Sequence, residues 1–129
     1  MSDTSPVIHL QGVTKRFGKF NAAKAVDISV PEGQIVGFVG ANGAGKTTTI
    51  SMLLGFLGVS EGAVDLFGVR VHPSNAHKSH NHIGYAAGDM ELPGQLTGKQ
   101  YLGFLRSQRT GGTNEQYHEL LKRFSPQLD

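Results

Sequence analysis

Gly40-Ala41-Asn42-Gly43-Ala44-Gly45-Lys46-Thr47-Thr48 occupies residues 40–48 of this chain. This stretch fits the phosphate-loop pattern G-x-x-x-x-G-K-[ST] at every required position. A short apolar, β-branched segment precedes it at residues 34–39, and apolar residues at helical spacing follow it through residue 54. A strand, a glycine loop and a helix are the three parts that the motif needs. The sequence therefore predicts a site for the phosphates of a nucleotide.

Each position of this loop has a chemical role in the predicted site. Its glycines allow consecutive backbone N–H groups to turn inward around an anion, and the helix that follows adds unpaired donors. The Lys46 side chain can reach the β- and γ-phosphates, so it is the predicted catalytic residue, and the Thr47 hydroxyl can ligate Mg²⁺. The alternative is a glycine-rich strand-to-helix turn with a solvated lysine. The predicted nucleotide-binding residues of the loop are Gly40, Asn42, Gly43, Ala44, Gly45, Lys46, Thr47 and Thr48.

Length and composition limit the kind of protein that can carry this loop. The 129 residues suit one modest domain or part of a larger one. Twelve Lys and Arg against ten Asp and Glu give a net charge of +2, which argues against nucleic acid as a main partner. No cysteine is present for a disulfide or a thiolate metal site, and no apolar run approaches 18 residues. We expect a soluble chain without a membrane anchor or signal peptide of its own.

The rest of the chain alternates expected strands and helices around a polar, histidine-containing segment. Residues 1–6 are expected to be a frayed lead, residues 14–20 a basic turn, and Thr97 the N-cap of a helix. The first strands are expected to be antiparallel, because their connections are too short for crossovers. Expected strands span residues 7–13, with a bulge at Gly12, and residues 25–30, 34–39, 61–68 and 83–87, the last a parallel core strand. Expected helices span residues 46 to 54 or 57, 98–108 and 114–124.

Four histidines gather in the polar segment, at His72, His77, His80 and His82. Two interpretations remain open. The histidines form a metal site, or they belong to a short solvated helix or loop that needs no ion.

Several motifs together resemble the nucleotide-binding domain of ABC transporters. They are the phosphate loop with the residues after it, and residues 12–18, 62–64 and 83–85, collinear with the family from about residue 7 to about 109. Residues 96–98 and 101–102 are similar to the drug- and polymer-exporter (ABC-2-like) branch. The resemblance implies an α/β fold: a P-loop NTPase (RecA-like) core with an N-terminal antiparallel β subdomain. It also implies ATP and Mg²⁺ as cofactors.

The resemblance adds two residues to the predicted site. Phe17 stands where the family places the aromatic residue that stacks on adenine; the alternative is a core phenylalanine, and Phe20 is the less favoured stacking partner. After the strand at residues 83–87 the family places a glutamine that touches Mg²⁺ and the attacking water. Gly88 stands there instead, so Asp89 is a candidate Mg²⁺ ligand, with a solvated turn aspartate as the alternative.

The family's signature sequence, its second acidic strand and its switch histidine would lie beyond residue 129. The resemblance thus implies that residues 1–129 are the N-terminal part of a single ATP-binding domain, which binds nucleotide without hydrolysing it alone. The whole protein would be the ATPase of a membrane exporter, cytoplasmic and held at the membrane by a permease subunit. Its partners would be that permease and a second nucleotide-binding domain. A soluble, non-transport ABC ATPase or a non-catalytic nucleotide-binding module is the alternative.

Overall fold

The computed structural model describes residues 6–88, 91, 93–108, 111 and 113–124. The chain divides into two compact units, residues 1–83 and residues 84–129. The first contains strands β1 (Ile8–Phe17), β2 (Phe20–Val30), β3 (Glu61–Leu66) and β4 (Val69–Arg70) and helices α1 (Lys46–Leu53) and α2 (His77–His80). The second contains helices α3 (Gly98–Ser107) and α4 (Asn114–Phe124).

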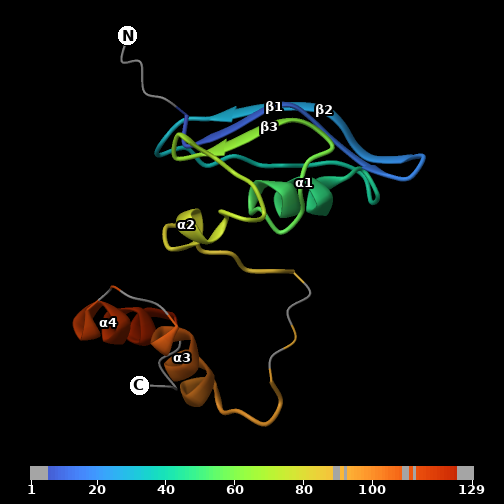
Figure 1. Cartoon of the computed structure of the whole chain (residues 1–129). Coiled ribbons are helices and arrows are strands. Elements are labelled where there is room, and N and C mark those ends of the chain that lie inside the picture. The colour runs from blue at the N-terminus through green and yellow to red at the C-terminus, as the bar shows by residue number, and fades with distance from the viewer. Residues whose placement is uncertain (1–5, 89–90, 92, 109–110, 112, 125–129) are drawn as a thin grey trace. The chain divides into compact units, whose positions relative to one another are not determined.

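The strands of the first unit form one antiparallel sheet in the order β2-β1-β3-β4 (Figure 1). The antiparallel pairing expected from the short connections is confirmed. The predicted basic turn over residues 14–20 was wrong in its extent, because β1 continues to Phe17 and β2 begins at Phe20. Phe17 and Phe20 face each other across the end of this hairpin. Only two residues therefore make the turn.

The expected bulge at Gly12 is confirmed, since the pairing of β1 with β2 shifts register between Leu10 and Val13. At such irregularities, side-chain oxygens of the same two strands accept hydrogen bonds from backbone N–H groups. The N–H of Gly12 donates to Oδ1 of Asp27 at 2.7 Å. The N–H of Ala25 donates to Oγ1 of Thr14 at 2.9 Å. Both long strands can bend here without leaving these donors unpaired.

Helix α1 packs on one face of the sheet and closes the core of the first unit (Figure 1). Met52 of α1 is buried together with Leu10, Val13 and Val64 from the sheet. Burial of side chains of this size typically stabilises a fold by about 1.5–3 kcal/mol each. This packing fixes the start of α1, and with it the phosphate loop, against the sheet.

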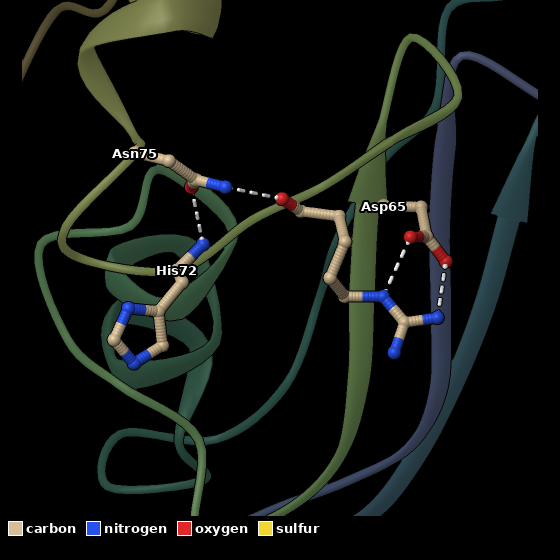
Figure 2. Close-up of polar contacts among 4 residues, drawn as sticks. Asp65, His72 and Asn75 are labelled. Atoms are coloured by element: carbon tan, nitrogen blue, oxygen red, sulfur yellow. Dashed lines mark hydrogen bonds and ion pairs between the residues drawn. The ribbon is translucent and has the colours of Figure 1, made fainter.

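The segment from β3 to α2 is held by a chain of polar contacts (Figure 2). The guanidinium of Arg70 donates from Nε to one carboxylate oxygen of Asp65 at 2.7 Å and from Nη2 to the other at 3.3 Å. The Asn75 amide donates to the Arg70 carbonyl at 2.9 Å, and its oxygen accepts from the N–H of His72 at 2.8 Å. His72 and Asn75 thus serve the turn that leads into α2.

The strand predicted at residues 34–39 is wrong, because the structure has no strand there. Its side chains nevertheless alternate: Gln34, Val36 and Phe38 line an apolar cavity of about 310 Å³ with residues of β1, β2 and α1. Ile35 and Val39, at the alternate positions, are almost fully exposed. A strand needs a neighbour for its backbone hydrogen bonds, and among the described residues none pairs with this segment.

The core strand predicted at residues 83–87 is also wrong, since the structure has no strand there either. Ile83 packs against the core of the first unit, and Tyr85 is half exposed. The unit boundary falls directly after Ile83. An apolar run is as compatible with the end of one compact unit as with a buried strand, and the sequence pattern does not separate these cases.

The second unit contains two short capped helices. Thr97 caps α3 as expected, with a capping box in which its hydroxyl accepts from the N–H of Gln100 and the Gln100 side chain accepts from the N–H of Thr97. The helix ends one residue before the predicted end, and α4 has the predicted bounds. The Arg106 guanidinium lies over the ring of Tyr117 at 4.8 Å and donates to the side chain of Asn114. These contacts tie α3 to α4.

Candidate nucleotide phosphate site

The phosphate loop joins the segment after β2 to the first turn of α1. The N–H of Ala44 donates to the carbonyl of Ala41 at 3.1 Å, which closes a turn over the middle of the loop. Gly43 and Gly45 have positive φ angles of 82° and 88°, a region that side chains disfavour. The motif therefore has glycine at two positions where the backbone adopts a positive φ angle.

Gly45 is also where the loop lies closest to the sheet. A methyl group built on its Cα would lie 2.1 Å from the carbonyl oxygen of Ala22 in β2. As the N-cap of α1, Gly45 provides no side chain to accept from the first-turn N–H groups, and that turn contains no acidic residue. Its carbonyl accepts from both the N–H and the hydroxyl of Thr49, at 2.8 and 2.9 Å. The helix start is thus fixed while its donors remain available to an anion.

The Lys46 side chain arches over the loop that precedes it. Its Nζ donates to the carbonyl of Gly40 at 2.6 Å and to the carbonyl of Ala41 at 2.8 Å. The ammonium group is therefore held within the loop by two neutral acceptors. Phosphate oxygens form stronger, charge-assisted hydrogen bonds with such a group.

A cavity of about 370 Å³ lies over the phosphate loop. Its lining combines hydroxyl, amide and ammonium groups with backbone and one aromatic ring. The lining residues are Phe20, Ala22, Asn42, Gly43, Gly45, Lys46, Thr47 and Thr48. No Asp or Glu belongs to this described lining. The cavity combines a cation, hydrogen-bond donors and a helix start, which is the chemistry that an anion needs.

The structure thus brings six of the eight predicted loop residues together around one cavity. The other two are Gly40 and Ala44, which form the loop's own hydrogen bonds. Phe17 does not line the cavity; its ring is 52% exposed and lies 5.2 Å from Nζ of Lys15. A buried core phenylalanine, the alternative for Phe17, is therefore wrong.

Phe20, the less favoured stacking partner in the sequence, lines the cavity. Phe20 and Ala22 of β2 both line the cavity, and Ala22 abuts the loop at Gly45. The pairing of β1 with β2 shifts register at Ala22, so simple strand alternation does not predict this arrangement.

Gly88 and the histidines of residues 72–82 do not line this cavity. Asp89 lies outside the described residues, and Gly88 is exposed. Nε2 of His80 donates to the carbonyl of Leu54 at 2.7 Å, which links α2 to the end of α1. Within the part of the chain that is described, no three His, Cys, Asp or Glu side chains are grouped to hold a metal ion. No described helix has the length and apolar character needed to cross a membrane.

Comparison with known proteins agrees with the loop and the sheet. A sequence model of the ABC transporter family matches residues 23–128. The ABC transporter ATP-binding protein YhaQ of Bacillus subtilis is 37% identical over 122 residues, 92% of this chain and 40% of that protein. The probable multidrug ABC transporter ATP-binding protein YbhF of Escherichia coli is 40% identical over 98 residues, 76% of this chain and 17% of that protein.

A solved structure of the ATP-binding subunit of an ABC transporter matches 95% of this chain and 51% of its own length, with a TM-score of 0.77 and 25% identity. The chain spans 40% or less of the two curated relatives. The family match, the fold and the phosphate loop agree, and we conclude that this chain belongs to the ABC transporter family and has the P-loop NTPase fold of its ATP-binding proteins.

Proposed function

We propose that the cavity over the phosphate loop binds the phosphates of ATP or ADP together with Mg²⁺. The observation that carries this proposal is the position of Lys46. Its ammonium group lies at the start of α1, in a cavity whose described lining contains no carboxylate. A nucleotide exchanges the carbonyls of Gly40 and Ala41 for phosphate oxygens as partners of Nζ, and the first-turn N–H groups of α1 complete the cradle.

The Mg²⁺ ion fits the oxygen donors of this cavity. Thr47 is exposed on the cavity wall, and its hydroxyl offers the kind of oxygen that Mg²⁺ prefers. Mg²⁺ usually keeps several waters and shares the phosphates of its nucleotide, so one protein ligand is sufficient. When bound, the ion neutralises charge on the phosphates. Asp89 remains a candidate for a second ligand.

Phe17 is the residue proposed for adenine stacking, on the basis of its position in the family pattern. More than half of its surface is exposed, so its ring is available to a base. Stacking of a base on an aromatic side chain contributes about 1–3 kcal/mol.

In the whole protein, this site belongs to an ATPase that couples ATP binding and hydrolysis to export. The name of one relative, the Nod factor export ATP-binding protein I of Ralstonia nicotianae, supports this direction. The partners are a second nucleotide-binding domain and a transmembrane permease subunit, which holds the protein at the cytoplasmic face of the membrane. Residues 1–129 form the N-terminal part of a single ATP-binding domain. The general base for hydrolysis is proposed to lie on the family's second acidic strand, beyond residue 129.

Calorimetry with ADP and Mg²⁺ tests the proposed site. Lys46→Ala removes a charge-assisted contact, so we expect an affinity loss of about 10- to 100-fold, equivalent to about 1.5–3 kcal/mol. Lys99→Ala is the matched control, because it removes the same charge from an exposed position of α3. Equal ADP affinities for the parent chain and the Lys46→Ala variant would refute the proposed phosphate contact.

ATP turnover by the 129-residue chain tests the proposal that its general base lies elsewhere. We expect a rate close to that of uncatalysed hydrolysis. A turnover near the low end of ordinary enzymes, about 1 s⁻¹, that disappears in the Lys46→Ala variant would contradict this expectation. Co-purification of the whole protein with a polytopic membrane protein would separate a transport role from the soluble alternatives.

A further inference from the structure

We propose that Phe20 is a second aromatic contact for the nucleotide, and that its ring packs on the nucleoside part of ADP or ATP. This inference rests on the proposed function of the phosphate loop. It goes beyond the family pattern, which assigns the stacking role to Phe17. The carrying observation is that Phe20 lines the same cavity as Lys46, Thr47 and Thr48.

The position of Phe20 along β2 determines which part of a nucleotide it can meet. Ala22 marks the point where β2 touches the phosphate loop, at Gly45. Phe20 lies two residues closer to the hairpin end, up to about 7 Å further along the strand. The pairing of β1 with β2 shifts register at Ala22, and both Ala22 and Phe20 line the cavity. In a nucleotide the sugar separates the base from the phosphates. A ligand whose phosphates occupy the loop can therefore place its nucleoside along this wall.

The exposure of Phe20 leaves its ring available for such a contact. It is 64% exposed, although its side chain reaches the lining of the cavity. Phe17 is its directly facing partner across the hairpin, and facing residues of antiparallel strands project to the same side of the sheet. Two aromatic side chains therefore flank one end of β1 and β2. Aromatic faces accept any base, because every base has a π-face.

The test separates the nucleoside from the phosphates by comparing ADP with inorganic tripolyphosphate as calorimetric ligands, both with Mg²⁺. Phe20→Ala is expected to weaken ADP binding about 5- to 150-fold, the usual range for loss of a base–aromatic stack. It is expected to leave tripolyphosphate binding within about twofold of the parent chain, because that ligand has no base to stack. Phe20→Tyr, which keeps the ring, is expected to restore ADP affinity.

Controls distinguish this inference from the proposal on which it rests. Lys46→Ala should weaken both ligands, and Phe104→Ala, at an exposed position of α3, should weaken neither. Unchanged ADP affinity in Phe20→Ala overturns the inference and leaves the phosphate site intact. An equal loss for both ligands also overturns it, because Phe20 would then only support the loop. Failure of the parent chain to bind either ligand overturns the proposed function, and this inference with it.

Discussion

Replacement of Gly45 by alanine tests whether the phosphate loop is held against β2 as the structure shows. The new methyl group would lie 2.1 Å from the carbonyl oxygen of Ala22, and 3.6 Å from Cα of Ala23. Both neighbours are backbone atoms of β2, and Ala23 pairs with Lys15 of β1, so a large shift of this backbone would disturb the sheet. The residue would also have to keep a φ angle of 88°. Gly45→Ala therefore carries two separate penalties.

The two penalties can be estimated separately. The left-handed conformation costs an L-residue about 1–2 kcal/mol. Overpacking against a fixed neighbour typically costs about 1–3 kcal/mol more. The expected loss for Gly45→Ala is therefore about 2–5 kcal/mol of the free energy of unfolding. Small domains have only about 5–15 kcal/mol in total, so this loss is a large fraction of the stability.

Gly43→Ala is the matched control, because it carries only the first penalty. Its φ angle is 82°, and no atom lies within 4 Å of the position of an added methyl group. We expect it to cost about 1–2 kcal/mol. Urea unfolding monitored by circular dichroism gives the free energy of unfolding for both variants. Equal losses for Gly43→Ala and Gly45→Ala would refute the close approach of Gly45 to β2.

Three further predictions concern the sheet, α3 and the unpaired segment. Asp27→Ala should reduce the free energy of unfolding by about 0.5–1.5 kcal/mol in urea melts, since the bulge loses the acceptor of the Gly12 N–H; Asp27→Asn, which keeps an acceptor oxygen, should cost less. Thr97→Ala should cost about 0.5–2 kcal/mol locally, seen as faster hydrogen exchange in the first turn of α3; unchanged exchange would argue against the capping box. The exposed side chains of Ile35 and Val39 should make the 129-residue chain associate with copies of itself or melt at low temperature; a monodisperse monomer with a high-temperature melt would contradict this.

The phosphate loop could be predicted from the sequence because its requirements are local. Positive φ angles at Gly43 and Gly45, the start of α1 at Lys46 and the reach of that lysine all depend on residues within one short stretch. The cap of α3 at Thr97 is local in the same sense, since it depends on Thr97 and Gln100 alone. Features that depend on a few consecutive residues follow from the pattern directly.

The hairpin of β1 and β2 was underestimated because its ends depend on pairing. Gly18 is typical of a turn, and the lysines around it are depleted in strands, so propensity alone places this stretch outside a strand. In the structure, Arg16 forms an ion pair with Glu61, and Lys15 donates to the carbonyl of Gly58 at 2.7 Å. These long-range contacts keep β1 in the sheet to its end. They also extend β2 to Phe20, which is how an aromatic residue reaches the cavity over the phosphate loop.

Residues 34–39 show that a sequence can specify the side-chain alternation of a strand without specifying its backbone pairing. The alternation of apolar residues determines which side chains face inward, and the structure keeps it: Val36 and Phe38 line the apolar cavity while Ile35 and Val39 face outward. The backbone ladder requires a second segment at hydrogen-bonding distance, which no local pattern can guarantee. Val36 and Phe38 line this cavity with residues of the sheet and α1, yet they stay 57% and 42% exposed, so they cover the core only in part. Among the described residues, the phosphate loop contacts the sheet at Gly45 against β2, and the segment that precedes it makes no strand pairing.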